Sequence, residues 1–133
     1  MQSPVDTIHV GAFARERLIQ LKRHTKIDNW NILSRWGYCL GLLSQGIPLK
    51  MPEGEKSNTE MTWRTFAGEY DELLSSVTRI ACLNATGKCT PKMLETFFYS
   101  RLDYGILLLG RKRQEQSIDE LIVNMLLRYD LKS

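Results

Sequence analysis

The chain has 133 residues, of which 43% are hydrophobic and 25% charged, and it carries a formal net charge of +3. This length suits one domain, and this composition is that of an ordinary globular protein, which excludes a disordered chain. No apolar run approaches the roughly 18 residues that a membrane span needs, and the first residues lack the basic and apolar regions of a secretory signal. We therefore expect one cytoplasmic domain over residues 1–133, without membrane contact.

The positive charge is concentrated at the start of the chain. Residues 1–50 contain seven Lys or Arg against three Asp or Glu, a net charge of +4, whereas residues 51–133 have a net charge of −1. Such asymmetry is typical of a surface that faces a polyanion, although a solvated basic helix face is an equally good interpretation from charge alone.

The first predicted elements are a strand and a helix. Residues 7–10 alternate polar and apolar side chains and predict a short strand before Gly11. From about Ala12 a helix is expected, whose buried stripe is Ala14, Leu18, Leu21 and Thr25. A basic ridge follows the same spacing beside that stripe and consists of Arg15, Lys22 and Lys26, with Arg23 at its edge.

A second helix is predicted over residues 30–43, capped by Asp28 or Asn29. Its expected apolar face is Ile32, Trp36, Leu40 and Leu43. Gly37 and Gly41 would allow close helix packing. Residues 46–61 contain prolines, glycines and charges, and predict a loop or hairpin-like excursion.

The second half of the chain predicts three more helices. One begins near Trp63 and should carry Tyr70, Leu73, Leu74, Val77 and Ile80 towards a core. Thr90-Pro91 starts the next, which we expect to end at Gly110. The capping box Ser117-Ile118-Asp119-Glu120 opens the last. The predicted fold is therefore mainly α, a compact bundle of about five helices with one short N-terminal strand and a ribbon-helix-helix-like start.

No active site can be assembled from local spacing. The sequence has no glycine-rich phosphate loop, no paired-histidine metal helix and no G-x-S-x-G turn. Its three cysteines, Cys39, Cys82 and Cys89, lack the spacing of a zinc site and predict buried, reduced thiols. We expect a protein that is not an enzyme, with no catalytic residue, metal or cofactor.

DNA binding through basic side chains is the better functional hypothesis. The candidate phosphate contacts are Arg15, Arg17, Lys22, Arg23, Lys26 and Arg35. Trp30 could stack on a base or anchor the core. Two alternatives stay open: an autonomous ribbon-helix-helix regulator that reads bases through Thr7 and His9, and a metal-dependent nickase, which would need clustered carboxylates.

Two sequence blocks resemble the DndE family. The first is LIQLKRHTKIDNWNILSRWGYCL at residues 18–40, and the second is TEMTWRTFAGEY at residues 59–70. The resemblance covers about residues 8–109, and residues 110–133 would be a C-terminal helical extension. The motif residues Trp63, Phe66 and Gly68 have a structural interpretation, as helix-start aromatics beside a tight glycine.

The resemblance implies a DNA-binding accessory subunit of the DNA phosphorothioation (sulfur modification) machinery. Other subunits, DndC-like and DndD-like, would be partners and would supply the chemistry. The same resemblance implies binding to nicked or intact duplex DNA, with a preference for nicks, and a homo-oligomer such as a tetramer. The basic surface would fall on Lys22, Arg23 and Lys26, with Arg15, Arg17 and Arg35 as neighbours.

Overall fold

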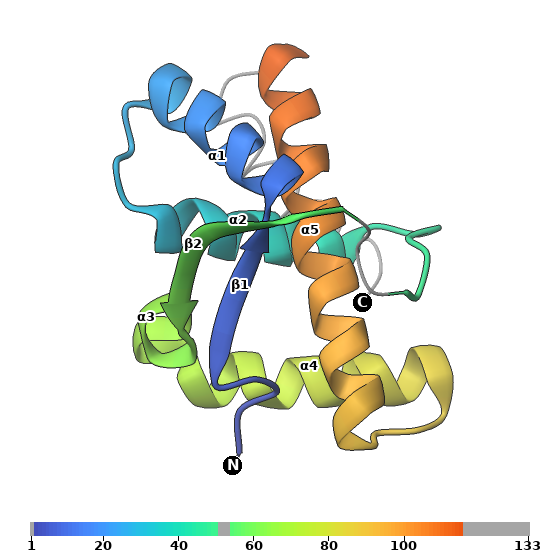
Figure 1. The fold of residues 1–133 in the computed structure, drawn as a ribbon. Helices are drawn as coiled ribbons and strands as arrows, with labels where there is room; N and C mark the ends of the chain where they lie inside the picture. The colour runs from blue at the N-terminus through green and yellow to red at the C-terminus, as the bar shows by residue number, and fades with distance from the viewer. Residues whose placement is uncertain (1, 51–53, 116–133) are drawn as a thin grey trace.

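The computed structural model describes residues 2–50 and 54–115, with side chains up to Arg111. The chain is mainly helical, as predicted (Figure 1). In chain order its elements are β1 (Thr7–Gly11), α1 (Ala12–Thr25), α2 (Trp30–Leu43), β2 (Lys56–Thr62), α3 (Trp63–Ala67), a 3-10 turn (Gly68–Tyr70), α4 (Asp71–Thr86) and α5 (Pro91–Glu115). No described helix is both long and apolar enough to cross a membrane.

Helices α2 and α5 cross at the centre of the molecule, and glycines let their backbones touch (Figure 1). A Cβ atom added to Gly105 would lie 1.9 Å from the carbonyl oxygen of Gly37, and one added to Gly41 would lie 2.1 Å from that of Arg101. The close packing predicted for Gly37 and Gly41 is thus confirmed. Leu33 and Leu40 flank the crossing and are buried.

The apolar face of α2 differs from the prediction. Of the four residues expected there, only Leu40 is buried, whereas Ile32, Trp36 and Leu43 are half-buried. The glycines cause this difference, because they turn the Gly37–Gly41 side of α2 towards α5 and leave the larger side chains at the margin.

An aromatic cluster fills the space beside this crossing. Tyr38, Trp63, Phe66 and Phe98 are buried, with ring centroids 4.9–5.8 Å apart in tilted or edge-on geometry. Trp63 and Phe66 therefore have the structural role that their motif suggested. Gly68 adopts a φ of +58°, which ends α3 where the sequence predicted an uninterrupted helix.

A two-stranded antiparallel sheet replaces the single predicted strand. β1 pairs with β2, with Thr7 opposite Thr62 and Ile8 opposite Met61. The prediction placed the residues of β2 in the loop or hairpin-like excursion, because nearly all of them are polar and only Met61 is buried. Ile8 and Val10 anchor the sheet in the core.

The outer edge of β1 lies against α5. The backbone N–H of His9 donates to the Tyr99 hydroxyl at 3.1 Å, and this hydroxyl donates to the Thr7 carbonyl at 3.3 Å. Both edges of β1 are thus engaged within the chain, whereas a ribbon-helix-helix protein pairs this strand with a partner's strand. The strand–helix–helix order is present, and the Tyr99 contacts lie at the edge of β1 that such pairing would use.

Three further predictions concern the second half of the chain. Helix α5 starts at Pro91, as predicted, with the Met93 N–H donating to the Thr90 hydroxyl at 3.3 Å. It does not end at Gly110 but continues to Glu115, and Gly110 instead accommodates the side chain of Arg17. The helix predicted after Ser117 lies outside the described residues.

The apolar residues of α4 are the clearest departure from prediction. Only Leu74 of the five expected core residues is buried. Four are exposed: Tyr70, which ends the 3-10 turn, and Leu73, Val77 and Ile80 of α4. The inner face of α4 is formed by smaller residues, among them Ser75, Thr78 and Cys82.

Candidate nucleic-acid interface

Helix α1 carries the predicted basic ridge, which we define as Arg15, Lys22, Arg23 and Lys26. Ala14, Leu18 and Leu21 are buried against the core, so the ridge lies beside the buried stripe, as the periodicity predicted. Arg15, Arg23 and Lys26 are exposed and Lys22 is half-buried. Lys22 and Arg23 lie in the last turn, where the helix dipole favours positive charge.

The end of α1 fixes the direction of the chain towards α2. Lys26 has a left-handed backbone, with φ 61°, and its N–H donates to the Lys22 carbonyl at 2.9 Å. The Thr25 hydroxyl donates to the Leu21 carbonyl and accepts from the Ile27 N–H. This closed turn brings Trp30, at the start of α2, beside the ridge.

Trp30 is the centre around which α1, α2 and β2 meet. The Lys22 Nζ lies 4.8 Å and the Arg15 Cζ 5.9 Å from the centroid of its ring. Arg15 also donates from Nε to the Thr59 hydroxyl of β2 at 2.9 Å. Among the described residues no carboxylate forms an ion pair with the ridge, so its positive charge is positioned by an aromatic ring but not neutralised.

Arg17 and Arg35 lie apart from the ridge. Arg17 packs against Gly110 of α5 and donates to the Gln20 amide oxygen at 3.3 Å. Arg35 donates to the Phe66 carbonyl at 2.9 Å and lies over the Tyr70 ring at 5.4 Å. These contacts hold α3 and the following 3-10 turn against α2. The structure thus brings together four of the six predicted residues.

A hollow of about 290 Å³ adjoins Trp30. It is lined by Asp28, Asn29, Trp30, Asn31, Thr59, Glu60, Met61 and Thr65. Its amide and hydroxyl groups suit contacts to the sugar–phosphate backbone, which do not depend on base sequence, whereas the carboxylates of Asp28 and Glu60 on its wall repel phosphate. Sequence reasoning did not assign Thr59 of β2 and Thr65 of α3 to the site, because only the folding of these elements onto α2 brings them to it.

His9 and Glu60 occupy the sheet next to this hollow. They are cross-strand neighbours in the register, and the His9 Nδ1 lies 3.1 Å from the Glu60 carboxylate. Because both side chains are largely exposed, this contact adds little stability. His9 therefore has a carboxylate neighbour inside the chain. The ribbon-helix-helix hypothesis would instead have His9 point towards a base.

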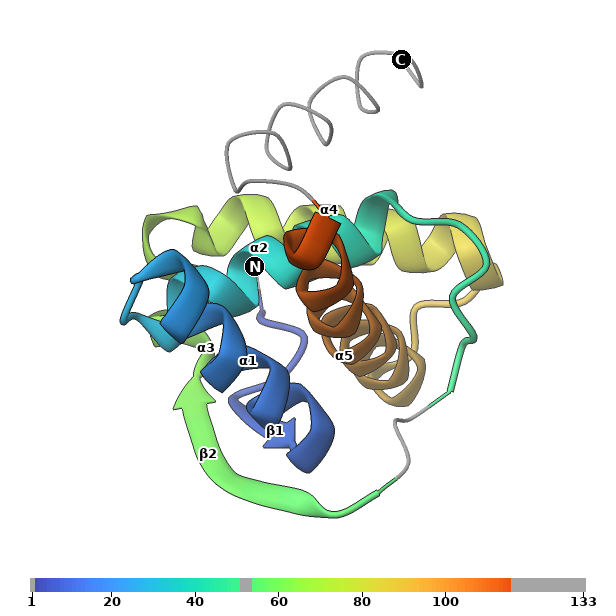
Figure 2. The same ribbon diagram turned by 90° about the horizontal axis from the view of Figure 1, so that it is seen from above.

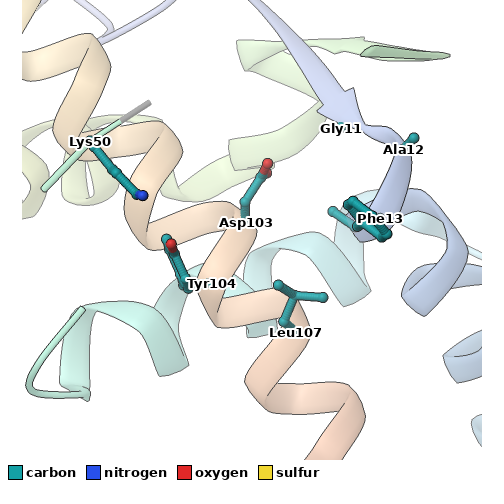
Figure 3. A pocket seen from close by; sticks show the side chains of 8 residues that line it. Gly11, Ala12, Phe13, Lys50, Asp103, Tyr104 and Leu107 are labelled. Atoms are coloured by element: carbon teal, nitrogen blue, oxygen red, sulfur yellow. The ribbon is translucent and has the colours of Figure 1, made fainter. Parts of the chain in front are cut away.

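A second hollow, of about 160 Å³, lies at the start of α1 (Figure 3). Asp103 of α5 points towards the Gly11–Ala12 turn there, with Tyr104 and Leu107 on the same helix. Asp103 is buried, its Oδ1 has no hydrogen-bond partner among the described residues, and burial raises its pKa to about 7. No sequence pattern singled out this carboxyl group.

Of the three thiols predicted to be buried, only Cys82 is buried, whereas Cys39 and Cys89 are half-buried. Cys39 and Cys82 are poorly suited to sulfur chemistry. Burial raises the pKa of Cys39 and of Cys82 above the usual thiol value, and the thiolate is the nucleophilic form. Cys82 also donates its S–H to the Lys88 carbonyl at 3.4 Å. Over residues 2–50 and 54–115, no group of three or more His, Cys, Asp or Glu is placed to hold a metal ion.

Comparison with known proteins finds a family and a solved structure to which this chain is similar. Residues 7–117 match a protein family described as "DNA sulphur modification protein DndE". The fold is similar to the crystal structure of a DndE mutant described as involved in DNA phosphorothioation, with a TM-score of 0.60 and 16% sequence identity over 80% of this chain and 98% of that chain. At this identity the structural likeness shows the fold alone. No curated protein matches the chain in sequence.

Proposed function

The chain belongs to the DndE family of DNA sulphur modification proteins, and from this premise we propose that it is a DNA-binding accessory subunit of the phosphorothioation machinery. The observation that carries the proposal is the basic ridge of α1, whose cations Arg15 and Lys22 are held over Trp30 without a carboxylate partner among the described residues. The ridge would bind the phosphates of duplex DNA.

The geometry favours binding that is independent of base sequence. Lysine and arginine side chains on one exposed helix face reach phosphates, and each neutralised phosphate releases counterions. The polar hollow beside Trp30 supplies further backbone contacts. We place the nick preference that the family resemblance implies at this hollow, since a strand end at a nick can leave the helical path and enter it.

The proposed role is binding and not catalysis. Burial raises the thiol pKa of Cys39 and of Cys82, and Asp103 lies in a separate hollow from the ridge. We propose that other subunits of the machinery supply the sulfur and the chemistry, while this chain holds the DNA. The autonomous regulator is disfavoured because Tyr99 occupies the edge of β1 that strand pairing between protomers would use.

The test is a salt titration of DNA affinity with paired variants. Lys22→Ala with Lys26→Ala should weaken binding to all duplex sequences alike and lower the log–log salt slope by about one per lost phosphate contact. The matched control is Lys88→Ala with Lys92→Ala, which removes the same charge from exposed positions around the start of α5. Fluorescence anisotropy on nicked and intact duplexes measures both.

The control variant should bind DNA as the unchanged protein does. If both double variants lose DNA affinity equally, net charge alone governs binding, and the ridge is not the DNA-binding surface. A loss confined to one DNA sequence would instead favour a regulator.

A further inference from the structure

The hollow at the start of α1 has no part in the proposed DNA binding. α1 and α5 lie side by side (Figure 2), and this hollow of about 160 Å³, here named the α1 hollow, opens between them (Figure 3). It shares no lining residue with the hollow beside Trp30. Its volume is below the roughly 300 Å³ at which pockets for drug-sized ligands begin, so it suits one small polar group.

The first turn of α1 supplies hydrogen-bond donors to this hollow. The Ala12 N–H donates to the Glu55 carbonyl at 2.9 Å. The N–H groups of Phe13 and Ala14, which also line the hollow, have no acceptor within the helix. The N-cap residue is Gly11, which has no side chain to cap them. Together with the positive end of the helix dipole, such N–H groups favour an anion.

Asp103 of α5 provides independent evidence for a bound group. It is only 8% exposed, it points towards the Gly11–Ala12 turn (Figure 3), and its Oδ1 has no hydrogen-bond partner among the described residues. A Cβ atom on Gly11 would lie 3.1 Å from its Oδ2, so the glycine leaves room for the carboxyl group. Because buried polar atoms are nearly always hydrogen-bonded, this oxygen points to a partner inside the hollow.

The charges around the hollow select the kind of anion. Lys50 lines it on the side of Asp103 away from Gly11 (Figure 3). Its ammonium group and the helix start attract an anion, whereas an ionised Asp103 repels one. An oxyanion that carries a proton satisfies both, because its O–H donates to the carboxylate while its other oxygens accept. Inorganic phosphate carries such a proton at pH 8, and sulfate does not.

The protonation of Asp103 sets how the hollow responds to pH. Burial raises the pKa of Asp103 to about 7, so below that pH the carboxyl group itself has a proton to donate. An anion without a proton should then bind at low pH and be lost as pH rises through about 7. The other titratable groups close to Asp103 are Lys50 and Tyr104 in the wall, Tyr99 on α5, and Glu55 and Lys56, which meet the Gly11–Ala12 turn from β2.

We infer that the α1 hollow binds inorganic phosphate as the hydrogen phosphate ion. Its oxygens accept from the first-turn N–H groups of α1 and from Lys50, and its O–H donates to the Asp103 carboxylate. One ion would thereby link the start of α1, the segment after α2 and the middle of α5. The site is separate from the basic ridge, so the inference goes beyond the proposed DNA binding.

The first test compares two anions of equal charge. The full chain, in a phosphate-free buffer at pH 8, is titrated with phosphate and with sulfate while its amide NMR signals are followed. Phosphate should shift the signals of Phe13 and Ala14 and bind roughly tenfold or more tightly than sulfate, because it gains a hydrogen bond to a charged group. Equal binding of the two anions, or no shift at Phe13 and Ala14, would overturn the proposal.

A phosphate monoester distinguishes free phosphate from the phosphate of a nucleotide. A nucleoside 5′-monophosphate has lost its last proton at pH 8, so it should bind as weakly as sulfate. If it binds as tightly as inorganic phosphate, no proton is shared with Asp103 and the inference is wrong.

Asp103→Asn tests the shared proton directly. The asparagine amide donates to an anion whether or not that anion carries a proton, so sulfate should bind at pH 8 about as tightly as phosphate. Asp6→Asn is the matched control, because Asp6 is exposed and lines neither hollow, and it should keep the preference for phosphate. A preference that survives Asp103→Asn would contradict the assignment.

The unchanged protein gives a second measurement that does not depend on the folding of a variant. Its affinity for sulfate should rise by roughly tenfold from pH 8 to about pH 5.5, because the carboxyl group gains its proton over this range. Lys50→Met should weaken phosphate and sulfate alike, since it removes a charge and no proton. A sulfate affinity that is independent of pH, or a preference set by Lys50, would overturn the inference.

The ridge variant separates this inference from the DNA-binding proposal. Lys22→Ala with Lys26→Ala should lose DNA affinity and keep the phosphate-dependent shifts of Phe13 and Ala14, whereas Asp103→Asn should keep DNA affinity and lose the preference for phosphate. If the shifts disappear in the ridge variant, phosphate binds to the ridge and the α1 hollow is not the site.

Discussion

Helices α2 and α4 both pack on α5, yet they do so in different ways. α2 lies at backbone contact with α5, because Gly37, Gly41 and Gly105 remove the side chains that would separate the helices. α4 meets the first turns of α5 through a small cluster of Cys82, Leu94 and Phe97, and it contributes Leu74 to the main core. The comparison shows that small residues decide how closely a helix is held, whereas large apolar residues can be left on the outside.

The largest effect should come from filling the α2–α5 crossing. Gly105→Ala would place a Cβ atom 1.9 Å from the Gly37 carbonyl oxygen, so the helices must separate. We expect a loss of roughly 4 kcal/mol or more in the free energy of unfolding, at the extreme of single substitutions. Urea denaturation followed by circular dichroism measures it.

Gly110→Ala, on the same helix, is the control for this prediction. Its Cβ atom would lie 3.3 Å from the flexible Arg17 Cδ, which can move aside. Because alanine favours a helix over glycine by about 1 kcal/mol, this variant should be as stable as the unchanged protein or slightly more so. Equal losses at Gly105 and Gly110 would mean that helix propensity, and not the crossing, sets the effect.

Asp103 is buried on α5, and its contribution to the free energy of unfolding should depend on pH. Burial raises the pKa of Asp103 from 3.8 to about 7, so the folded protein holds a proton that the unfolded chain has released. Stability should therefore fall as pH rises from about 4 to about 7 and stay low above that. The largest difference that this shift allows is about 4 kcal/mol.

Asp103→Asn should remove this component. The variant should be more stable than the unchanged protein at pH 8, and the difference should shrink towards pH 4, as measured by thermal unfolding at each pH. If the stability of the two proteins changes with pH in the same way, Asp103 is hydrated or paired in solution, and its burial does not destabilise the fold at high pH.

The smallest effects should separate the two faces of α4. Leu74→Ala removes a buried side chain, 6% exposed, and should cost about 2–3 kcal/mol. Leu73→Ala, at the neighbouring position and 59% exposed, should change the free energy of unfolding of the monomer by less than about 0.5 kcal/mol. Chemical denaturation measures both. A large effect of Leu73→Ala would place the Leu73 face of α4 inside the fold.

Local sequence signals predicted several features correctly. The mainly helical class and the positions of α1 and α2 follow from periodicity, and the start of α5 at Thr90–Pro91 follows from capping, both of which act within one or two turns. The cap predicted for α2 differs, because Asn29 occupies the N-cap position but makes no side-chain cap hydrogen bond. The basic ridge beside the buried stripe of α1 follows from the same geometry. The two motif blocks identified the family, which the match over residues 7–117 confirms.

Only the tertiary structure decided which surfaces are covered. Periodicity shows that Leu73, Val77 and Ile80 share a face of α4, but not whether another element lies on that face. A glycine such as Gly110 ends a helix or admits a neighbour according to what lies opposite it, and here Arg17 lies there. Likewise β2 is held by its pairing with β1, and burial beside the Gly11 turn raises the pKa of Asp103. These features depend on contacts between residues distant in sequence, which no local pattern contains.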